Sequence, residues 1–339
     1  MQNFTRRSFI KTISTGSAVV VAAMYSARAS AADFTLKYGS YQPASYPLTI
    51  RSQEMAARIK EQSKGRIDFQ VYPSGQLGND TNMLSQLREG SIDFMTLSAL
   101  TLGVLVPAAQ ISGIGFAFKD YNTVWKAMDG DLGEYVRRKI ETTSLFAFEK
   151  MWDNGFREMT TSTHQLLTPA DLSNLKMRVP PSPLWTSMFR AFGAAPTTIS
   201  LGDVYTSLQT HIVEGQENPL ALIEAVKIYE VQKYCAMTNH MWDGFWCLGN
   251  KKRFARLPKD LQEIVQRNVN DAAIKQRNDV AVLNGTLTDT LKARGLQFNN
   301  VDEGAFRAKL QTSGFYKEWK NKFGDELWTE LEKYSGKIA

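Results

Sequence analysis

Short segments of alternating apolar and polar residues are separated along this chain by longer segments with a helical period. Phe34, Leu36 and Tyr38 occupy every second position of FTLKYG, which predicts a strand. The next segment, IRSQEMAARIKEQSKG, has the pattern of an amphipathic helix that stops at Gly65, and IDFQVYP predicts another strand. TNMLSQLREG (helix) and SIDFMTLS (strand) repeat the succession. Strands that alternate with helices are typical of parallel α/β units.

A second set of such segments begins after WDNGFREMTTS. Pro169 and Asp171 open a short predicted helix, LKMRVP predicts a strand, and PLWTSMFRAFG predicts a helix closed by Gly193. The segment LGDVYTSLQTHIVEG is predicted to be helical as well. Two α/β lobes are the simplest architecture for this order of elements, and the chain of 339 residues is long enough for two cores.

One helix is predicted from Pro258 to Gly295, because apolar residues recur there at spacings near three and four. At about 1.5 Å per residue it would be roughly 55 Å long, well beyond the ~30 Å of a small domain. A helix of that length has to run along both lobes. The alternative is a break near Asn284 and Gly285.

The strand in NLKMRVPPSP raises the question of a binding site. Met177 and Val179 share one face of it, which leaves Lys176 and Arg178 on the other. Arg178 is either a solvated charge or a site residue, since it lies at the carboxyl end of its strand, where open α/β sheets bind ligands.

Two further polar residues have comparable positions. Arg157 follows WDNGF, and Asn218 precedes Pro219, where a helix is expected to stop. An arginine can hold a carboxylate through two parallel hydrogen bonds, and a second arginine with an asparagine amide can satisfy the remaining lone pairs.

Residues 1–31 have the anatomy of a cleaved export signal. Arg6 and Arg7 precede a weakly apolar run, and Ala29-Ser30-Ala31 is a cleavage site of the usual kind. The arginine pair in TRRSFIK indicates the twin-arginine type, with a general secretory signal as the alternative. The apolar run is shorter than the roughly 20 residues of a spanning helix, so we expect a soluble periplasmic protein after cleavage.

Charge and composition exclude several classes of protein. Residues 1–31 contain four basic residues and no acidic ones, so their removal lowers the formal net charge from +6 to +2. The basic balance is therefore no indication of nucleic acid binding. Charged residues at 22% and hydrophobic ones at 43% are those of an ordinary globular protein.

The usual signatures of enzymes and metal sites are absent from the sequence. Three widely spaced histidines form no metal-binding motif, and there is no P-loop, nucleophile elbow or complete dinucleotide-binding motif. We therefore predict no cofactor and no metal, with a cofactor-loaded exported enzyme as the rival class. Cys235 and Cys247 can form a disulfide or remain free thiols, and the sequence leaves both open.

Several motifs in a fixed order carry a family resemblance. DNGFREMTTS, LKMRVP and GAAPTTISLGDVYTSLQTHIVEGQENPLALIEAVKIYEVQKYCAMTNH, together with YPSGQLGNDTNMLSQLREGSIDF, resemble the DctP-type periplasmic substrate-binding proteins of TRAP transporters. The resemblance extends over essentially the whole chain after the signal. It implies a two-lobed periplasmic-binding-protein fold of the α/β class, with a hinge and a long helix shared by both lobes.

The resemblance also implies domains, partners and site residues. Lobe 1 would comprise 32–154 and 244–283, and lobe 2 would comprise 155–243 and 284–339. Arg178 would form the main salt bridge to a ligand carboxylate, assisted by Arg157 and Asn218. The partners would be a small organic acid and the small and large TRAP membrane subunits, with a monomeric protein that delivers its ligand for uptake driven by an ion gradient. A sensory role remains an alternative.

The ligand is predicted from positions at which this chain differs from the family members that bind sialic acid. Sialic-acid binders carry a glutamate where this chain has Ser98, and a phenylalanine where it has Leu201. Tryptophans gather near the expected cleft, although each can also be a core residue: Trp152, Trp185 and Trp242. With Phe245, Trp246, Leu97, Leu100 and Leu102 they favour a cleft with one apolar end. We therefore predict an aromatic 2-oxo or 2-hydroxy acid such as phenylglyoxylate or mandelate, with uronates and aliphatic or dicarboxylic acids as alternatives.

Overall fold

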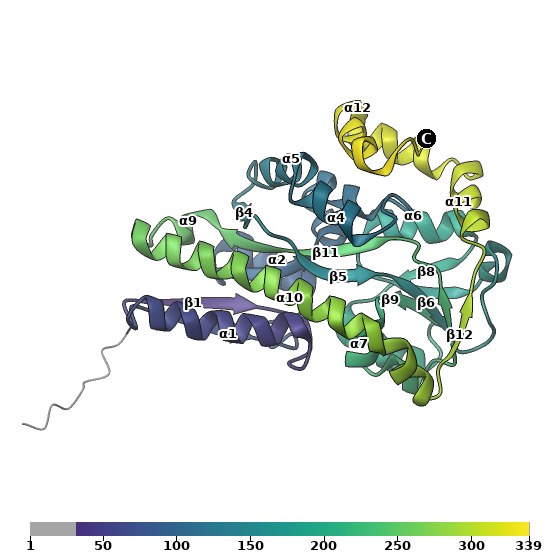
Figure 1. Cartoon of the computed structure of the whole chain (residues 1–339), viewed down its shortest axis with the longest axis horizontal. Coiled ribbons are helices and arrows are strands. Elements are labelled where there is room, and N and C mark those ends of the chain that lie inside the picture. Colours follow the sequence, from purple (N-terminus) through teal and green to yellow (C-terminus); the bar gives the residue numbers. More distant parts are fainter. Residues whose placement is uncertain (1–31, 339) are drawn as a thin grey trace, which may run out of the picture. The chain divides into compact units, whose positions relative to one another are not determined.

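The computed structural model describes residues 32–338, which contain two six-stranded sheets and the helices around them. The predicted export signal, with its twin-arginine motif, lies outside the described residues. Figure 1 shows the arrangement of the elements. The α/β class and the two-lobed fold with a long helix, predicted from the sequence, are confirmed.

The first sheet contains the parallel strands predicted for the N-terminal half. β1 pairs in parallel with both β2 and β3, while β11 runs antiparallel to β3, β4 and β5. The order is β2-β1-β3-β11-β4, and β5 pairs with β11 at the same edge. The strands are β1 Phe34–Gly39, β2 Ile67–Tyr72, β3 Phe94–Ser98, β4 Leu145–Ala147, β5 Trp152–Phe156 and β11 Trp242–Asn250.

The second sheet has the order β12-β10-β6-β9-β7-β8. β7 is parallel to β8 and β9, and β6 is antiparallel to β9 and β10. The strands are β6 Glu158–Thr161, β7 Lys176–Val179, β8 Ala195–Thr198, β9 Gly215–Asn218, β10 Tyr234–Met237 and β12 Gln297–Asn300.

The chain crosses between the two sheets twice through short connections and a third time through α10 (Lys259–Ala293), which leads from β11 to β12. It leaves the first sheet at the end of β5 and enters β6 directly after Arg157, and it returns from β10 to β11 through residues 238–241. The boundaries predicted from the sequence, 154/155 and 243/244, lie inside β5 and β11. Arg157 and Asp243 are therefore at the junction of the two sheets.

Helices cover both sheets. Those before the first crossing are α1 Pro47–Gln62, α2 Asp80–Glu89, α3 Ala99–Leu102, η1 Pro107–Gly113, α4 Tyr121–Met128 and α5 Asp131–Ile140. Those between the crossings are η2 Pro169–Leu172, α6 Pro183–Phe192, α7 Leu201–Gln209, α8 Leu220–Ala225 and η3 Ile228–Glu230. The last are α9 Lys251–Phe254, α10 Lys259–Ala293, α11 Glu303–Thr312 and α12 Phe315–Ser335.

The long helix α10 has 35 residues and continues through Asn284 and Gly285, so the alternative of a break there is wrong. It packs against α1 and β5 and, further along, against α8 and β12 (Figure 1). Its contact with α1 includes an ion pair in which Arg51 Nε lies 2.6 Å from Asp279 Oδ2. The helix therefore contacts elements on both sides of the crossing strands, as the periodicity predicted.

The C-terminal helix α12 contacts elements of both predicted lobes. It packs against η1, α4 and α5, which precede the first crossing, and against α6, which follows it (Figure 1). Trp319 and Trp328 of this helix share one apolar cluster with Trp185 and Phe189 of α6.

One helix prediction was too long. The segment Leu201–Gly215 was predicted to be helical, but α7 ends at Gln209, His211 has a φ of +56°, and strand β9 begins at Gly215. β9 lies between β6 and β7, and all four of its residues, GQEN, are buried. A strand that consists of polar residues has no apolar alternation and therefore gives no period-two signal. Its side chains can be buried because partners distant in sequence form their hydrogen bonds.

Candidate functional site

A buried cavity lies at the junction of the two sheets. The volume open to the centre of a water molecule is about 20 Å³, so only a few atoms fit between the walls in this conformation. Its lining residues come from both predicted lobes: Tyr41, Gln42, Asp80, Ser98, Thr101, Asn154, Arg157, Arg178, Pro180, Trp185, Leu201, Asn218, Leu222 and Asp243.

Arg178 of β7 lines this cavity. The alternative left open by the sequence, a solvated charge, is therefore wrong. It is 1% exposed, whereas its neighbour Lys176 is exposed. Its Nε donates to the carbonyl oxygen of Ile199 at 2.8 Å, and its Nη1 has no hydrogen-bond partner. Burial, and to a lesser degree the neighbouring Arg157, lowers the pKa of Arg178 to about 10. The guanidinium is therefore a buried cation at neutral pH with donor capacity left for a ligand.

Arg157 is already paired within the protein. Its Nη2 donates to Glu217 Oε1 and to Asn218 Oδ1, both at 2.8 Å, and its Nε donates to Glu217 Oε2. Its Nη1 lies 3.4 Å from Asp243 Oδ2, and its guanidinium lies 4.7 Å from the ring centroid of Trp185. Burial opposes ionisation of Glu217, but Arg157 and then His240 hold the pKa of this carboxyl below its usual value. Arg157 therefore holds Asn218 and Trp185 in place at the cavity wall.

His240 completes this ion-pair cluster from behind. Its Nε2 lies 3.2 Å from Glu217 Oε2, and its Nδ1 lies 2.8 Å from Thr238 Oγ1. Burial lowers the pKa of His240, against the opposing effect of Glu217. The imidazole is thus neutral near pH 7 and serves as a hydrogen-bonding support.

Asp243 and Ser98 form the facing wall. Asp243 accepts hydrogen bonds from Ser98 Oγ and from Asn154 Nδ2, both at 2.7 Å. Burial raises the pKa of Asp243 to about 6, with Arg157 acting in the opposite direction. Ser98 also caps α3, since its Oγ accepts from the N–H of Leu100 at 3.3 Å. The neutral Ser98 therefore contacts an acidic residue, Asp243, within the cavity wall.

Three lining side chains contain buried polar atoms without a hydrogen-bond partner. They are the acceptor Gln42 Oε1 and the donors Arg178 Nη1 and Trp185 Nε1. Such atoms are rare in folded proteins because each costs free energy when unpaired. Five further atoms of this kind lie elsewhere within residues 32–338, among them Trp152 Nε1 and Trp246 Nε1, so what distinguishes the cavity is that three of them meet there.

Six of the eight residues predicted as ligand contacts line the cavity: Arg178, Arg157, Asn218, Ser98, Trp185 and Leu201. The other two lie in the apolar interior. Trp242 donates from Nε1 to Asp153 Oδ1 at 2.9 Å and packs edge-on against Trp125. Trp152 belongs to a core cluster. Phe245, Trp246, Leu97, Leu100 and Leu102 are also buried outside the lining.

Other lining residues were not singled out from the sequence, notably Tyr41, Gln42, Asp80, Asn154 and Asp243. A usable signal existed for Tyr41 and Gln42, because they follow the carboxyl end of the parallel strand β1, where α/β sheets bind ligands. Asp243 gave no such signal, since its strand is antiparallel and its neighbours are apolar.

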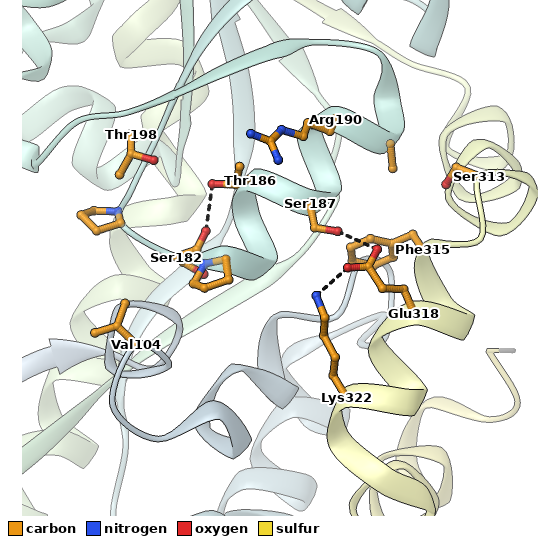
Figure 2. A pocket seen from close by; sticks show the side chains of 13 residues that line it. Val104, Ser182, Thr186, Ser187, Arg190, Thr198, Ser313, Phe315, Glu318 and Lys322 are labelled. Atoms are coloured by element: carbon orange, nitrogen blue, oxygen red, sulfur yellow. Dashed lines mark hydrogen bonds and ion pairs between the residues drawn. The ribbon is translucent and has the colours of Figure 1, made fainter.

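A larger groove of about 800 Å³ lies on the surface between α6 and α12. Figure 2 shows Ser187, Glu318 and Lys322 directed toward one another across it. Ser187 Oγ lies 3.2 Å from Glu318 Oε2, and Lys322 Nζ lies 2.5 Å from Glu318 Oε1. Glu318, the carboxylate of this groove, is thus already paired with Ser187 and Lys322, whereas the buried cavity contains an unpaired arginine Nη1, so the buried cavity is the better candidate.

Residues 32–338 were also searched for metal-binding groups and for membrane-spanning helices. No group of three or more histidine, cysteine, aspartate or glutamate side chains there could hold a metal ion. No helix in this range combines the length and apolar character needed to cross a bilayer. Cys235 and Cys247 are buried free thiols. The sequence left a disulfide and free thiols open, and the structure shows free thiols.

Comparison with known families gives a match over most of the chain. Residues 38–321 match the family described as bacterial extracellular solute-binding protein, family 7. The sialic acid-binding periplasmic protein SiaP of Vibrio cholerae is 31% identical over 297 residues, which cover 88% of this chain and 92% of SiaP. The protein y4mM of Sinorhizobium fredii is 34% identical over 262 residues, which cover 77% of this chain but only 48% of y4mM.

A solved structure has the same fold. The TRAP periplasmic solute-binding protein of Sulfitobacter sp. NAS-14.1, with bound β-D-galacturonate, superposes with a TM-score of 0.85 at 25% identity. The match covers 90% of this chain and 100% of that one.

Proposed function

This chain belongs to bacterial extracellular solute-binding protein family 7, the DctP-type binding proteins of TRAP transporters. We propose that it captures a small organic carboxylate in the cavity between its two sheets. The observation that carries the proposal is Arg178, a buried cation that has no carboxylate partner within residues 32–338 and an unpaired Nη1 in the cavity. A buried charge is stable only when it is paired, and a ligand carboxylate supplies the missing partner.

The other residues of the predicted clamp have supporting roles in this proposal. Asn218 Oδ1 accepts from Arg157 Nη2, and one N–H of Asn218 Nδ2 donates to Gln216 Oε1. The second N–H of this amide would donate to the carboxylate. Arg157 fixes Asn218 and Trp185, while Glu217 balances its own charge. Ser98, Leu201 and Trp185 would contact the remainder of the ligand, while Trp152 and Trp242 would act only through the packing around the hinge.

Binding would proceed by closure around the ligand. The carboxylate would dock on Arg178 while the lobes are apart, since the closed cavity admits only a few atoms. Closure then removes water and strengthens the ion pair, because the interaction of two charges grows as the local dielectric constant falls. The closed protein would be the form recognised in the periplasm by TRAP small and large membrane subunits, which would use an ion gradient for uptake.

The chemical class of the carboxylate is the finer part of the proposal. An aromatic acid, as predicted from the sequence, would find two aromatic side chains among the lining residues, Trp185 and Tyr41. The other aromatic residues expected near the ligand lie outside the lining: Trp152, Trp242, Phe245 and Trp246. The lining is otherwise mainly polar. Of the relatives described above, SiaP of Vibrio cholerae binds sialic acid and the protein of Sulfitobacter sp. NAS-14.1 holds β-D-galacturonate. These observations favour a hydrophilic acid over phenylglyoxylate or mandelate, and nothing in the family favours the alternative of an exported enzyme.

The proposal is tested by thermal unfolding against D-galacturonate, D-glucuronate, sialic acid, succinate, mandelate and phenylglyoxylate. A ligand at about 100 times its Kd stabilises a protein by about 2.7 kcal/mol, which raises Tm by a few degrees. We expect at least one acid to produce this shift and Arg178→Ala to abolish it. An equal shift in the parent and in Arg178→Ala would contradict the carboxylate clamp.

A further inference from the structure

Gln42 is a buried side chain in the cavity that the carboxylate clamp does not use. It is 1% exposed, and its Oε1 has no hydrogen-bond partner. Its backbone is fixed, since its N–H donates to Ser40 Oγ at 3.2 Å and its carbonyl oxygen accepts from the N–H of Ser74 at 2.9 Å. Within residues 32–338, a buried amide oxygen on a fixed backbone thus lies in the cavity without a hydrogen-bond donor.

Gln42 lies on a wall whose charged members are acceptors. Asp80 and Asp243 line the cavity beside it, and both are near Tyr41: burial and then these two carboxylates raise the pKa of the Tyr41 phenol. Asp80 is the first residue of α2 and accepts from Ser200 Oγ at 3.0 Å. Gln42, Asp80 and Asp243 all belong to segments on the side of the first sheet.

The lining residues from the second sheet and its helices contribute donors. The two unpaired donors, Arg178 Nη1 and Trp185 Nε1, belong to β7 and α6 on the side of the second sheet. The cavity therefore has a donor side, suited to a carboxylate, and an acceptor side, suited to O–H or N–H groups. A second carboxylate on the acceptor side would face Asp80 and Asp243, and like charges in a buried site repel strongly.

We infer that Gln42 is a specificity-determining residue, which accepts a hydrogen bond from a hydroxyl group of the ligand and so selects hydroxylated monocarboxylates over plain and dicarboxylic acids. The inference rests on the proposed function, because it places the carboxylate of the same ligand on Arg178. A site built to accept a hydroxyl proton rejects an analogue without it, since the buried acceptor is then left unpaired.

Three acids with the same four-carbon chain provide the test: D-erythronate with three hydroxyls, butyrate with none, and succinate with a second carboxylate. D-galacturonate serves as a larger hydroxylated probe. Titration calorimetry of the parent measures the Kd of each acid. The hydroxylated acid that binds more tightly, D-erythronate or D-galacturonate, should have a Kd at least about tenfold lower than those of butyrate and succinate. Gln42→Leu, which has a similar size and no acceptor, should weaken the hydroxylated acid about tenfold and leave butyrate unchanged.

The matched control is Gln209→Leu, at an exposed position of α7 outside the cavity, which should change none of the affinities. Equal weakening of all acids by Gln42→Leu would overturn the inference, as would a parent that binds butyrate or succinate as tightly as the hydroxylated acids. The comparison of ligands on the parent holds even if Gln42→Leu folds poorly. An unchanged affinity in Arg178→Ala would instead overturn the proposed function.

Discussion

Arg157 and Glu217 form a two-pronged ion pair that is buried at the point where the chain passes between its two sheets. Arg157 Nη2 lies 2.8 Å from Glu217 Oε1, and the side chains are 2% and 0% exposed. The pair neutralises Arg157, so that of the two arginines in the cavity only Arg178 lacks a carboxylate partner. Under the proposed function, Arg178 would therefore bind the ligand and Arg157 would position its neighbours.

Arg178→Ala should lower ligand affinity by about 2 to 5 kcal/mol, because the desolvated carboxylate loses its ionic partner. Arg178→Lys should also bind poorly, since a point charge does not reproduce the planar fork. Titration calorimetry with the best ligand of the panel measures both. Lys176→Ala, two residues earlier on the same strand and exposed, is the matched control and should bind like the parent. Parent-like binding by Arg178→Lys would show that only charge matters.

Glu217→Gln should reduce the free energy of unfolding by about 3 to 5 kcal/mol, because it leaves the buried Arg157 without its principal counter-charge. Urea unfolding followed by tryptophan fluorescence measures the change. Glu134→Gln breaks an exposed ion pair with Arg138 and should change stability by no more than about 0.5 kcal/mol. Similar small effects of the two substitutions would contradict the structural role of the buried pair.

Trp185→Phe and Trp242→Phe should have different consequences. The first removes an unpaired Nε1 at the cavity wall and should weaken ligand binding about fivefold or more. The second removes the hydrogen bond to Asp153 and should lower stability by about 1 to 3 kcal/mol while affinity stays within about twofold. Paired measurements of Kd and Tm on both variants separate the effects. A larger loss of affinity in Trp242→Phe would restore this residue as a ligand contact.

Stability should fall as the pH rises. Burial raises the pKa values of Asp153 and Glu158 to about 7, so the folded protein holds these protons more tightly than the unfolded chain does. Ionisation therefore favours unfolding, and the free energy of unfolding should decrease between about pH 4 and pH 7. Asp153→Asn removes one such penalty, worth on the order of 2 to 4 kcal/mol.

Urea unfolding at pH 5, 6, 7 and 8 measures this slope, which should be shallower in Asp153→Asn. The exposed Asp203→Asn serves as the control and should keep the slope of the parent. A parent that becomes more stable from pH 5 to pH 8 would contradict the assignment of these buried carboxyls.

The sequence alone determined the elements whose signal is local. Apolar periodicity located the strands before and after α1, and it located α10, because a helix or strand that buries one face has to repeat its apolar residues at a fixed spacing. The position of Arg178 near the carboxyl end of its strand indicated a binding site, because open α/β sheets bind ligands at that edge. The motifs that resemble a known family added Arg157 and Asn218.

Only the tertiary structure decided which side chains meet in the cavity. Gln42, Asp80 and Asp243 lie far apart in the sequence and converge through sheet pairing, which no local pattern records. The same holds for β9, whose polar residues are buried because Arg157 and other distant groups satisfy them. Trp152 and Trp242 were expected near the ligand, yet they pack in the interior. An aromatic residue has the same sequence signal in a core as in a binding site, and only its neighbours in space distinguish the two.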